Sequence, residues 1–305
     1  MNAALEIIAE GLDFPEGPVS MPDGSVLVVE IASPRLTRID ADGRKDVIAT
    51  LSGGPNGAAS GPDQSLIICN NGGLSWAQIM GFKVPVGPPA DYAGGWIERV
   101  DLASGRVDRL YTHFDDGSRL KAPNDLVMDG EGGFWFSDFG KTYDEQLDWG
   151  AIGYARLDGS LCKRVVKRVL SPNGVGLSPD RSALYYAETL TGRVFGLRIQ
   201  APGEIAPVMP HMPGFLVASL PRAIGLDSLA VEESGHVCVA TLFEGGIGIC
   251  DPLDGRVELF GTPDLITTNI CFGGADRRDA YITLSGTGKL AKCRWPRPGL
   301  KLAYH

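Results

Sequence analysis

Six acidic or amide residues recur at equivalent places along the chain, each in a short polar stretch such as Phe-Pro-Glu-Gly-Pro. About seven residues after each one lies a polar turn, and a short apolar run such as Val26–Val29 follows the turn. Carboxylate and amide oxygens, without His or Cys, are the ligands that a hard divalent cation prefers. These positions therefore indicate an oxygen-only metal site, provided that the fold brings them together. We call them the register residues: Glu16, Asn56, Asn124, Asn173, Asp227 and Asn269.

The intervals between successive register residues are 40, 68, 49, 54 and 42 residues. Such spacing, with strand-like segments throughout and no long helical pattern, predicts an all-β fold, a six-bladed β-propeller. The first strand of each blade lines the central channel of a propeller, so six equivalent positions converge on one axis. We interpret the apolar runs as these first strands, because burial of both faces gives an unbroken apolar run.

One domain spanning residues 1–305 is predicted, because no repeat of roughly 50 residues could bury a core alone. The weakly alternating stretch Leu5–Ala9 is expected to pair with the C-terminal strand Lys289–Trp295 and to complete the last blade. The longest interval contains an apolar insertion, residues 74–95, for which we favour a lid over the site, with packing on the scaffold as the alternative. Five prolines make residues 201–221 a second predicted loop.

The composition argues against several classes of function. A net charge of −9 disfavours binding to nucleic acid or to anionic membranes. No apolar run approaches the roughly 20 residues of a membrane span, and the N-terminus lacks the basic and apolar regions of a signal peptide. Six cysteines without C-x-x-C spacing indicate reduced structural thiols. We expect a cytoplasmic protein without nucleic-acid or membrane partners.

Four motifs stand out along the chain: Glu16-Gly17-Pro18, Pro123-Asn124-Asp125, Pro172–Asp180 and Asp227–Val231. Together they resemble the motifs of the gluconolactonase / senescence marker protein (regucalcin) family of lactone hydrolases. The resemblance covers nearly the whole chain, and the four motifs occur in the family's order. It implies a six-bladed propeller that holds one divalent cation and hydrolyses lactones.

Matched residue by residue, the resemblance implies that Glu16, Asn173 and Asp227 bind the cation. It also implies that Asp227 is the catalytic base and that Asn124 contacts substrate close to the metal. Because all these ligands are oxygen donors, we expect Ca²⁺ first, with Mg²⁺, Mn²⁺ or Zn²⁺ as alternatives.

Further contacts to substrate are expected from Asn56, Asn269 and Asn71, the last lying in a turn where the insertion begins. Sugar-lactone enzymes of the family often carry Arg two residues before the Asn124 position, where this chain has Ala122 preceded by Lys121. Lys121 is a candidate substrate contact, although it is one residue out of phase on a strand. Together with the apolar insertion, this departure argues against a simple aldonolactone and allows a less polar lactone.

Two alternatives stay open at the level of the sequence. One is a propeller that binds a cation or a partner without catalysis, and the other is a propeller esterase that acts on aryl esters or phosphotriesters. The carboxylate of Asp227 favours an enzyme, because a neutral ligand would be enough to hold an ion. We therefore predict a divalent-metal-dependent lactonase with a small-molecule lactone as its substrate.

Overall fold

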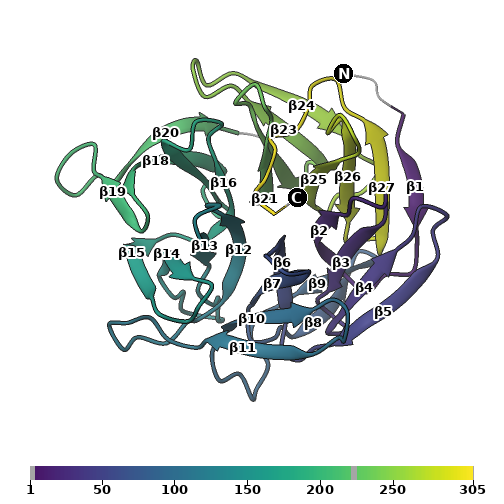
Figure 1. The fold of residues 1–305 in the computed structure, drawn as a ribbon, viewed down its shortest axis with the longest axis horizontal. Coiled ribbons are helices and arrows are strands. Elements are labelled where there is room, and N and C mark those ends of the chain that lie inside the picture. The colour runs from purple at the N-terminus through teal and green to yellow at the C-terminus, as the bar shows by residue number, and fades with distance from the viewer. Residues whose placement is uncertain (1–3, 221–224, 305) are drawn as a thin grey trace.

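Six β-sheets stand around a central axis like the blades of a propeller (Figure 1). The computed structural model describes residues 4–220 and 225–304. Every regular secondary-structure element found in these residues is a β-strand. The fold is therefore the six-bladed β-propeller that the repeat predicts. From the axis outward, blade one consists of β2 (Pro15–Ser20), β3 (Val26–Glu30), β4 (Arg35–Ile39) and β5 (Lys45–Thr50). Blade two consists of β6 (Pro55–Ser60), β7 (Ser65–Asn70), β10 (Trp96–Asp101) and β11 (Val107–Tyr111). Blade three consists of β12 (Pro123–Met128), β13 (Gly133–Asp138), β14 (Gly150–Arg156) and β15 (Cys162–Val169).

Blades four to six follow the same plan with two additions. A short extra strand, β19 (Glu204–Ala206), joins blade four, and the N-terminal strand β1 (Glu6–Ala9) joins blade six. The other strands of blade four are β16 (Pro172–Leu177), β17 (Ala183–Glu188), β18 (Arg193–Ala201) and β20 (Gly214–Ser219). Blade five consists of β21 (Gly225–Val231), β22 (Val237–Leu242), β23 (Gly246–Cys250) and β24 (Val257–Gly261). The other strands of blade six are β25 (Thr267–Gly273), β26 (Asp279–Leu284) and β27 (Lys289–Arg294).

The innermost strand of each blade is the one that contains the register residue. Our assignment of the apolar runs to this place is therefore wrong by one strand, since runs such as Val26–Val29 form the second strands. A second strand has a partner on each side and packs against neighbouring blades on both faces, which explains its unbroken apolar run. The inner strands escaped notice because Pro and Gly at their starts, as in Pro15-Glu16-Gly17-Pro18, are typical of turns.

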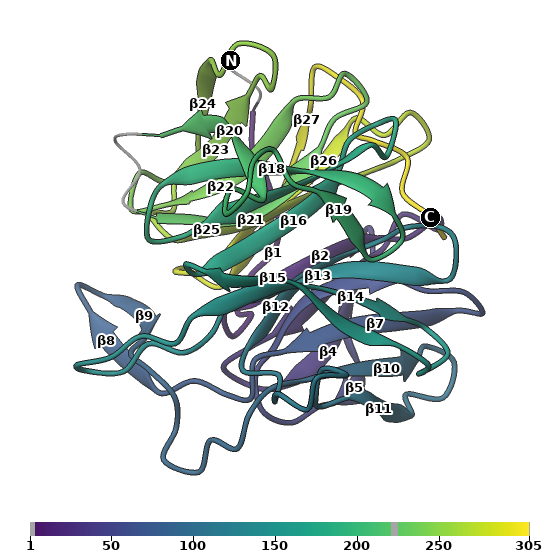
Figure 2. The same ribbon diagram turned by 90° about the vertical axis from the view of Figure 1, so that its left-hand side faces the viewer.

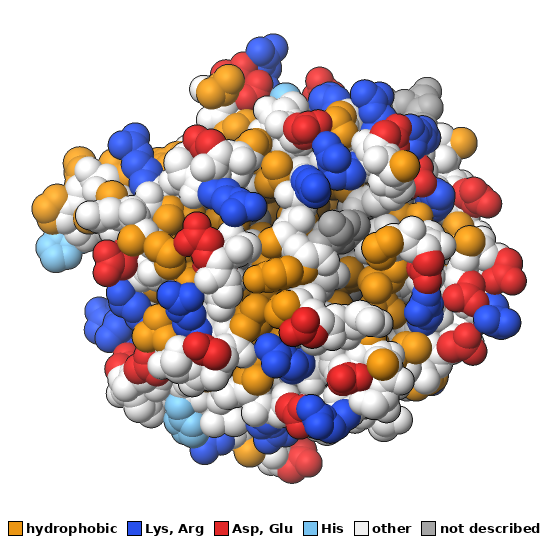
Figure 3. Space-filling model, viewed as in Figure 1, with side chains coloured by type: hydrophobic (Ala, Val, Ile, Leu, Met, Phe, Trp, Pro, Cys, Tyr) orange, Lys and Arg blue, Asp and Glu red, His pale blue; other side chains and the backbone are white. Residues whose placement is uncertain are grey.

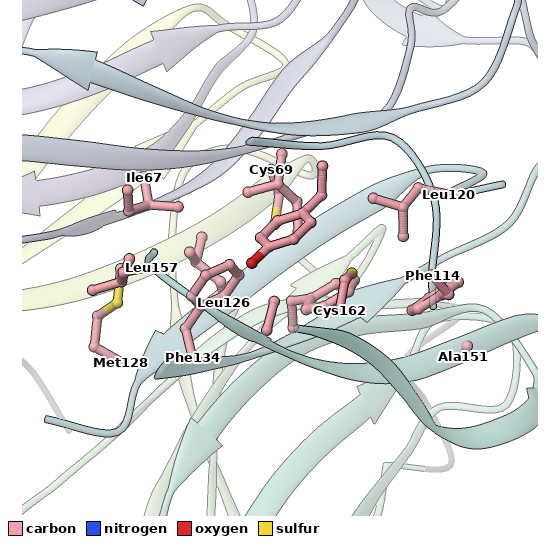
Figure 4. Packing of buried hydrophobic residues seen from close by; sticks show 14 residues of the cluster. Ile67, Cys69, Phe114, Leu120, Leu126, Met128, Phe134, Ala151, Leu157 and Cys162 are labelled. Carbon is pink, nitrogen blue, oxygen red and sulfur yellow. The ribbon is translucent and has the colours of Figure 1, made fainter. Parts of the chain in front are cut away.

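Buried apolar side chains fill each of the six interfaces between adjacent blades. Between blades two and three, Ile67 and Cys69 face Phe134 and Leu126 (Figure 4). Since every blade packs against two neighbours, closing the ring removes both faces of each sheet from water. The hydrophobic effect thereby fixes where the inner strands lie relative to one another.

The first and last strands of the chain close the ring. Strand β1 pairs with β27 in antiparallel fashion, with Ile7 opposite Ala291, which confirms the predicted closure. Apolar residues of this blade, among them Leu290, pack against Val26 and Val28 of blade one. The seam is thus held by strand pairing and by a buried interface together.

The two ends of the channel are covered differently. Residues 74–95 contain the hairpin of β8 (Trp76–Ile79) and β9 (Phe82–Pro85), which projects from one face (Figure 2). On the opposite face, where the C-terminal residues lie, apolar side chains gather around the axis (Figure 3). There Leu300 donates its backbone N–H to Val231 O (2.9 Å), which ties the tail to an inner strand.

Residues 201–221, predicted as a loop, contain β19 and β20 as far as they are described; Pro221 lies outside the described residues. Strand β20 pairs with β18 and forms the outer edge of blade four. The four described prolines of this stretch stand between these strands, where they remove no ladder hydrogen bond. Within residues 4–220 and 225–304 there is no helix long and apolar enough to cross a membrane.

Truncation of Leu290 to Ala tests the importance of the closing interface. Leu290 is 0% exposed, so we expect Leu290→Ala to lower the free energy of unfolding by about 2–5 kcal/mol through lost burial and a residual cavity. Urea unfolding measures the change. The matched control is Leu253→Ala, 94% exposed, for which we expect less than about 0.5 kcal/mol. Equal stability of the two variants would contradict the role given to the seam.

Candidate functional site

The register residues lie at one end of the channel, where the inner strands begin. In every blade the pairing between the innermost and the second strand is interrupted at the register residue or next to it. Such bulges re-aim a side chain and are frequent beside active sites. Five register residues line one cavity of about 320 Å³, together with Asn71: Glu16, Asn56, Asn124, Asn173 and Asp227. The sixth, Asn269, is held against Glu16.

Glycine allows the inner strands to approach one another closely at this level. Gly17 has a φ of 50°, and a Cβ atom there would lie 2.5 Å from the carbonyl oxygen of Asn56. A Cβ atom on Gly174 would lie 2.4 Å from the backbone nitrogen of Leu229. No larger residue fits either position, so these glycines set the width of the ring around its axis.

Glu16 is buried and only half satisfied by hydrogen bonds. Its Oε2 accepts from the Gly17 backbone N–H and from Asn269 Nδ2, each at 2.7 Å. Its Oε1 has no hydrogen-bond partner. Burial raises the pKa of the Glu16 carboxyl above its ordinary value, against hydrogen bonds, chiefly from Asn269 and Gly17, that favour the charged form.

Two asparagines add further unpaired oxygens. Asn173 donates from Nδ2 to Thr189 Oγ1 (3.1 Å), which orients its amide and leaves Oδ1 without a partner. Asn124 Oδ1 is likewise buried and unpaired. Buried oxygens without donors are rare in folded proteins and call for a ligand, a water molecule or an ion.

Three carboxyl groups lie close enough to influence one another. Burial, and then the negative charge of Glu16, raise the pKa of Asp227 well above its ordinary value. The same two causes raise the pKa of Asp125 to about 7. Asp125, which lines the pocket at the other end of the channel and acts on Asp227 through its charge, is an acid that our sequence analysis did not single out. It directly follows Asn124, where three of the other register residues are followed by Gly, and this contrast was the available signal.

These residues fit a divalent cation. Unpaired oxygens of Glu16 and Asn173, beside the Asp227 carboxylate, supply the donors that hard cations prefer. A positive ion among them would also relieve the repulsion that raises their pKa values. No cluster of three His, Cys, Asp or Glu side chains suited to a metal occurs in the described parts of the chain. Binding would therefore depend on an amide oxygen as well as on the two carboxylates.

The upper wall of the cavity is apolar and comes in part from the insertion. Leu74, Val84 and Pro85 line the cavity, and the Trp76 ring lies 4.8 Å from that of Phe14. The hairpin thus packs on the scaffold and also borders the site. Residues 74–95 therefore combine the two predicted roles, a lid over the site and a segment packed on the scaffold. Such a wall excludes water and offers few partners to sugar hydroxyls.

Lys141 is a residue of this cavity that sequence analysis missed. It follows β13 in the loop leading to β14, lines the cavity and is 3% exposed. Its Nζ donates to Gly73 O (2.7 Å) and reaches Asn71 Oδ1 at 3.5 Å. Burial lowers the pKa of Lys141 to about 7. Nothing in its local sequence distinguishes it from a solvated loop lysine, because its burial depends on residues about 70 positions earlier.

Lys121, a predicted substrate contact, lies outside this cavity. Its Nζ pairs with Asp148 at 3.0 Å, and both residues line a separate pocket, whereas Ala122 lines the cavity. Successive residues of an extended chain point in opposite directions, which accounts for the difference. Of the other predicted site residues, all but Asn269 line the cavity, and Asn269 lies against Glu16.

Comparison with known proteins gives a consistent set of relatives. The sequence model of the SMP-30/Gluconolactonase/LRE-like region matches residues 14–286. The chain is 26% identical to lactonase drp35 of Staphylococcus haemolyticus over 80% of this chain and 67% of that protein. A match to lactonase drp35 of Staphylococcus epidermidis, 28% identical, spans 41% of this chain and 37% of the relative.

Two solved structures share the fold over almost their whole length. A gluconolactonase from Xanthomonas campestris superimposes with a TM-score of 0.75 and 23% identity, covering 96% of this chain and 90% of the other. The calcium-binding protein regucalcin from Agrobacterium tumefaciens superimposes with a TM-score of 0.72 and 18% identity, covering 98% of both chains. At these identities the superpositions support the fold alone.

The burial of Lys141 predicts a pH-dependent contribution to stability. Its pKa is lower in the folded than in the unfolded chain, so the unfolded chain binds a proton at a higher pH than the folded chain does. The free energy of unfolding therefore decreases as the pH falls from the ordinary lysine pKa towards 7. We expect the difference in unfolding free energy, wild type minus Lys141→Met, to increase between pH 7 and pH 10. Urea unfolding across this range measures it. Parallel profiles for the two proteins would show that the ammonium is not desolvated.

Proposed function

The chain belongs to the SMP-30/gluconolactonase/LRE-like family, and on this premise we propose that its site hydrolyses a lactone with the help of one divalent cation. The observation that carries the proposal is the group of buried, unpaired oxygens at the channel axis. Lactonases among its sequence relatives support the reaction type. A cytoplasmic location and the absence of nucleic-acid and membrane partners stay predictions from the sequence.

Glu16, Asn173 and Asp227 would hold the cation. All three line the same cavity and come from blades one, four and five. Their oxygen donors favour Ca²⁺, with Mg²⁺, Mn²⁺ or Zn²⁺ as alternatives. The description of one structural relative as calcium-binding agrees with this choice. Asn269 would act indirectly, since its Nδ2 fixes one oxygen of Glu16 and leaves the other free.

A bound cation would polarise the lactone carbonyl and lower the pKa of nearby water. Asp227 accepts the proton of the attacking water and returns it to the alkoxide oxygen that leaves when the ring opens. Asn124, whose buried Oδ1 is unpaired, orients the lactone against this group. Asn56 and Asn71 line the cavity on the side of blade two and are proposed to contact the rest of the substrate.

The apolar wall suits a substrate with few hydroxyl groups. Phe14, Leu74 and Ile266 surround the space above the polar floor. In such an enclosure electrostatic interactions with the reacting atoms are stronger than in water. We therefore propose a lactone less polar than a sugar lactone, with the hairpin of β8 and β9 as its cover.

Replacement of the proposed base separates catalysis from cation binding. We expect Asp227→Asn to lower kcat for lactone opening by about 10²-fold or more, because the amide cannot accept the proton. Acid release from a panel of lactones, followed with a pH indicator, measures the rate. Asp63→Asn, the same change in an exposed turn, serves as control. An Asp227→Asn protein that binds the cation and keeps full activity would rule out this role.

Removal of the cation tests the metal site by a readout other than activity. A cation that binds only the folded state at 100 times its Kd should stabilise the protein by about 2.7 kcal/mol. We therefore expect Ca²⁺ to raise the Tm of chelator-treated protein. The effect should be lost in Glu16→Gln and kept in Glu6→Gln, where the same change affects an exposed strand residue.

Activity and cation binding together distinguish the alternatives. Acid release that chelator abolishes supports the enzyme. Stabilisation by Ca²⁺ without turnover of any lactone would instead indicate a propeller that only binds the cation. A Tm that no divalent cation changes would contradict the proposed metal site.

A further inference from the structure

A buried ammonium group faces the same cavity as the carboxylates. Lys141 Nζ donates to the carbonyl oxygen of Gly73 and lies near Asn71 Oδ1. It also lies 4.9 Å from the centre of the Tyr92 ring, at a distance where a cation and an aromatic face attract. These contacts hold the lysine in one place, but all three partners are neutral groups.

Lys141 forms no ion pair with any described residue. The carboxylate of Asp138 acts on it only at longer range and offsets part of the effect of burial on its pKa. Every ion pair found between side chains of residues 4–220 and 225–304 involves other groups, so no carboxylate lies within 4.0 Å of its Nζ. A desolvated cation without an anion is unfavourable, and buried charges in proteins are normally paired. The lowered pKa of Lys141 expresses this cost. An anionic group entering the cavity would remove it.

The ammonium and the proposed metal ligands occupy different arcs of the ring. Lys141 belongs to blade three and is held by Gly73 of blade two, whereas the three ligands come from blades one, four and five. All of them line the one cavity, and apolar side chains such as Leu74 and Phe139 stand around them. The cavity therefore offers a positive group at a second, separate position beside the acidic one.

We propose that Lys141 binds a carboxylate carried by the substrate, so that the site takes a lactone acid whose skeleton is otherwise apolar. The inference rests on the proposed lactonase function and names its substrate class. Lys141 is thus a specificity-determining residue, and Asp227 keeps its role at the ester carbonyl.

The surroundings of Lys141 suit a carboxylate in particular. Asn71 Oδ1 accepts from Gly73 N–H (2.9 Å) and faces Lys141, while its Nδ2 makes no hydrogen bond to the described residues. The ammonium and this amide can donate to the two oxygens of one carboxylate. A phosphate would need more donors than this pair supplies, and hydroxyl groups alone would not compensate the charge.

The test compares two substrates that share one ring. 5-Oxotetrahydrofuran-2-carboxylate carries a carboxylate where γ-valerolactone carries a methyl group. We expect wild-type protein to prefer the carboxylate, and Lys141→Met to lower the ratio of the two kcat/KM values by roughly tenfold or more, because a charge-assisted hydrogen bond is lost. Lys163→Met, the same change at an exposed position of the same blade, should keep the wild-type ratio.

Binding of an analogue without an ester gives a second readout. Tetrahydrofuran-2-carboxylate cannot be opened, and its affinity can be measured by calorimetry with the cation present and after chelation. We expect Lys141→Met to weaken binding by roughly tenfold in both states. Equal affinity of wild type and Lys141→Met after chelation would overturn the inference, since the carboxylate would then not use the lysine.

The outcomes separate this inference from the function on which it rests. Turnover of both lactones with a ratio unchanged in Lys141→Met would overturn the role of Lys141 and leave the lactonase standing. Loss of analogue binding in Lys141→Met, without turnover of either lactone, would support the anion site and contradict the lactonase. The urea unfolding of Lys141→Met shows whether that variant is folded.

Discussion

Burial of carboxylate and amide oxygens at the axis of an apolar ring is the constraint on which this molecule depends. Glu16 Oε1, Asn124 Oδ1 and Asn173 Oδ1 are removed from water and receive no hydrogen bond. Oxygens in that state destabilise a fold unless something positive or hydrogen-donating occupies the space between them. The burial of apolar side chains in the six interfaces between blades stabilises the fold and offsets this cost.

The ring has six similar blades, but the site that it builds is asymmetric. Only the first and the fifth register residues are carboxylates, and only blade three adds an acid directly after its register residue, Asp125. Asn269 is used to orient Glu16 and is not part of the cavity lining. One repeated backbone arrangement therefore supplies equivalent positions, while the choice of side chain at each position assigns different roles.

The loops add what the repeat cannot provide. The hairpin of β8 and β9 walls the cavity with apolar side chains, and the loop after β13 contributes Lys141. At the other end, near the axis where the C-terminal residues lie (Figures 1 and 2), Leu300, Leu302 and Ala303 line a separate, smaller pocket of about 100 Å³. The cavity thus combines the carboxylates of Glu16 and Asp227, the ammonium group of Lys141 and apolar walls.

The sequence by itself determined the repeat, and with it the propeller, the closure by β1 and the convergence of the register residues, because these follow from spacing and residue type. It misassigned the innermost strands, since Pro and Gly beside residues such as Glu16 and Asn173 look like turns until the bulged pairing is seen. Only the tertiary structure decided that Lys121 turns outward while Lys141 is buried in the cavity. The burial of a side chain and the charges around it depend on contacts between blades, and these contacts join residues that lie far apart in the sequence.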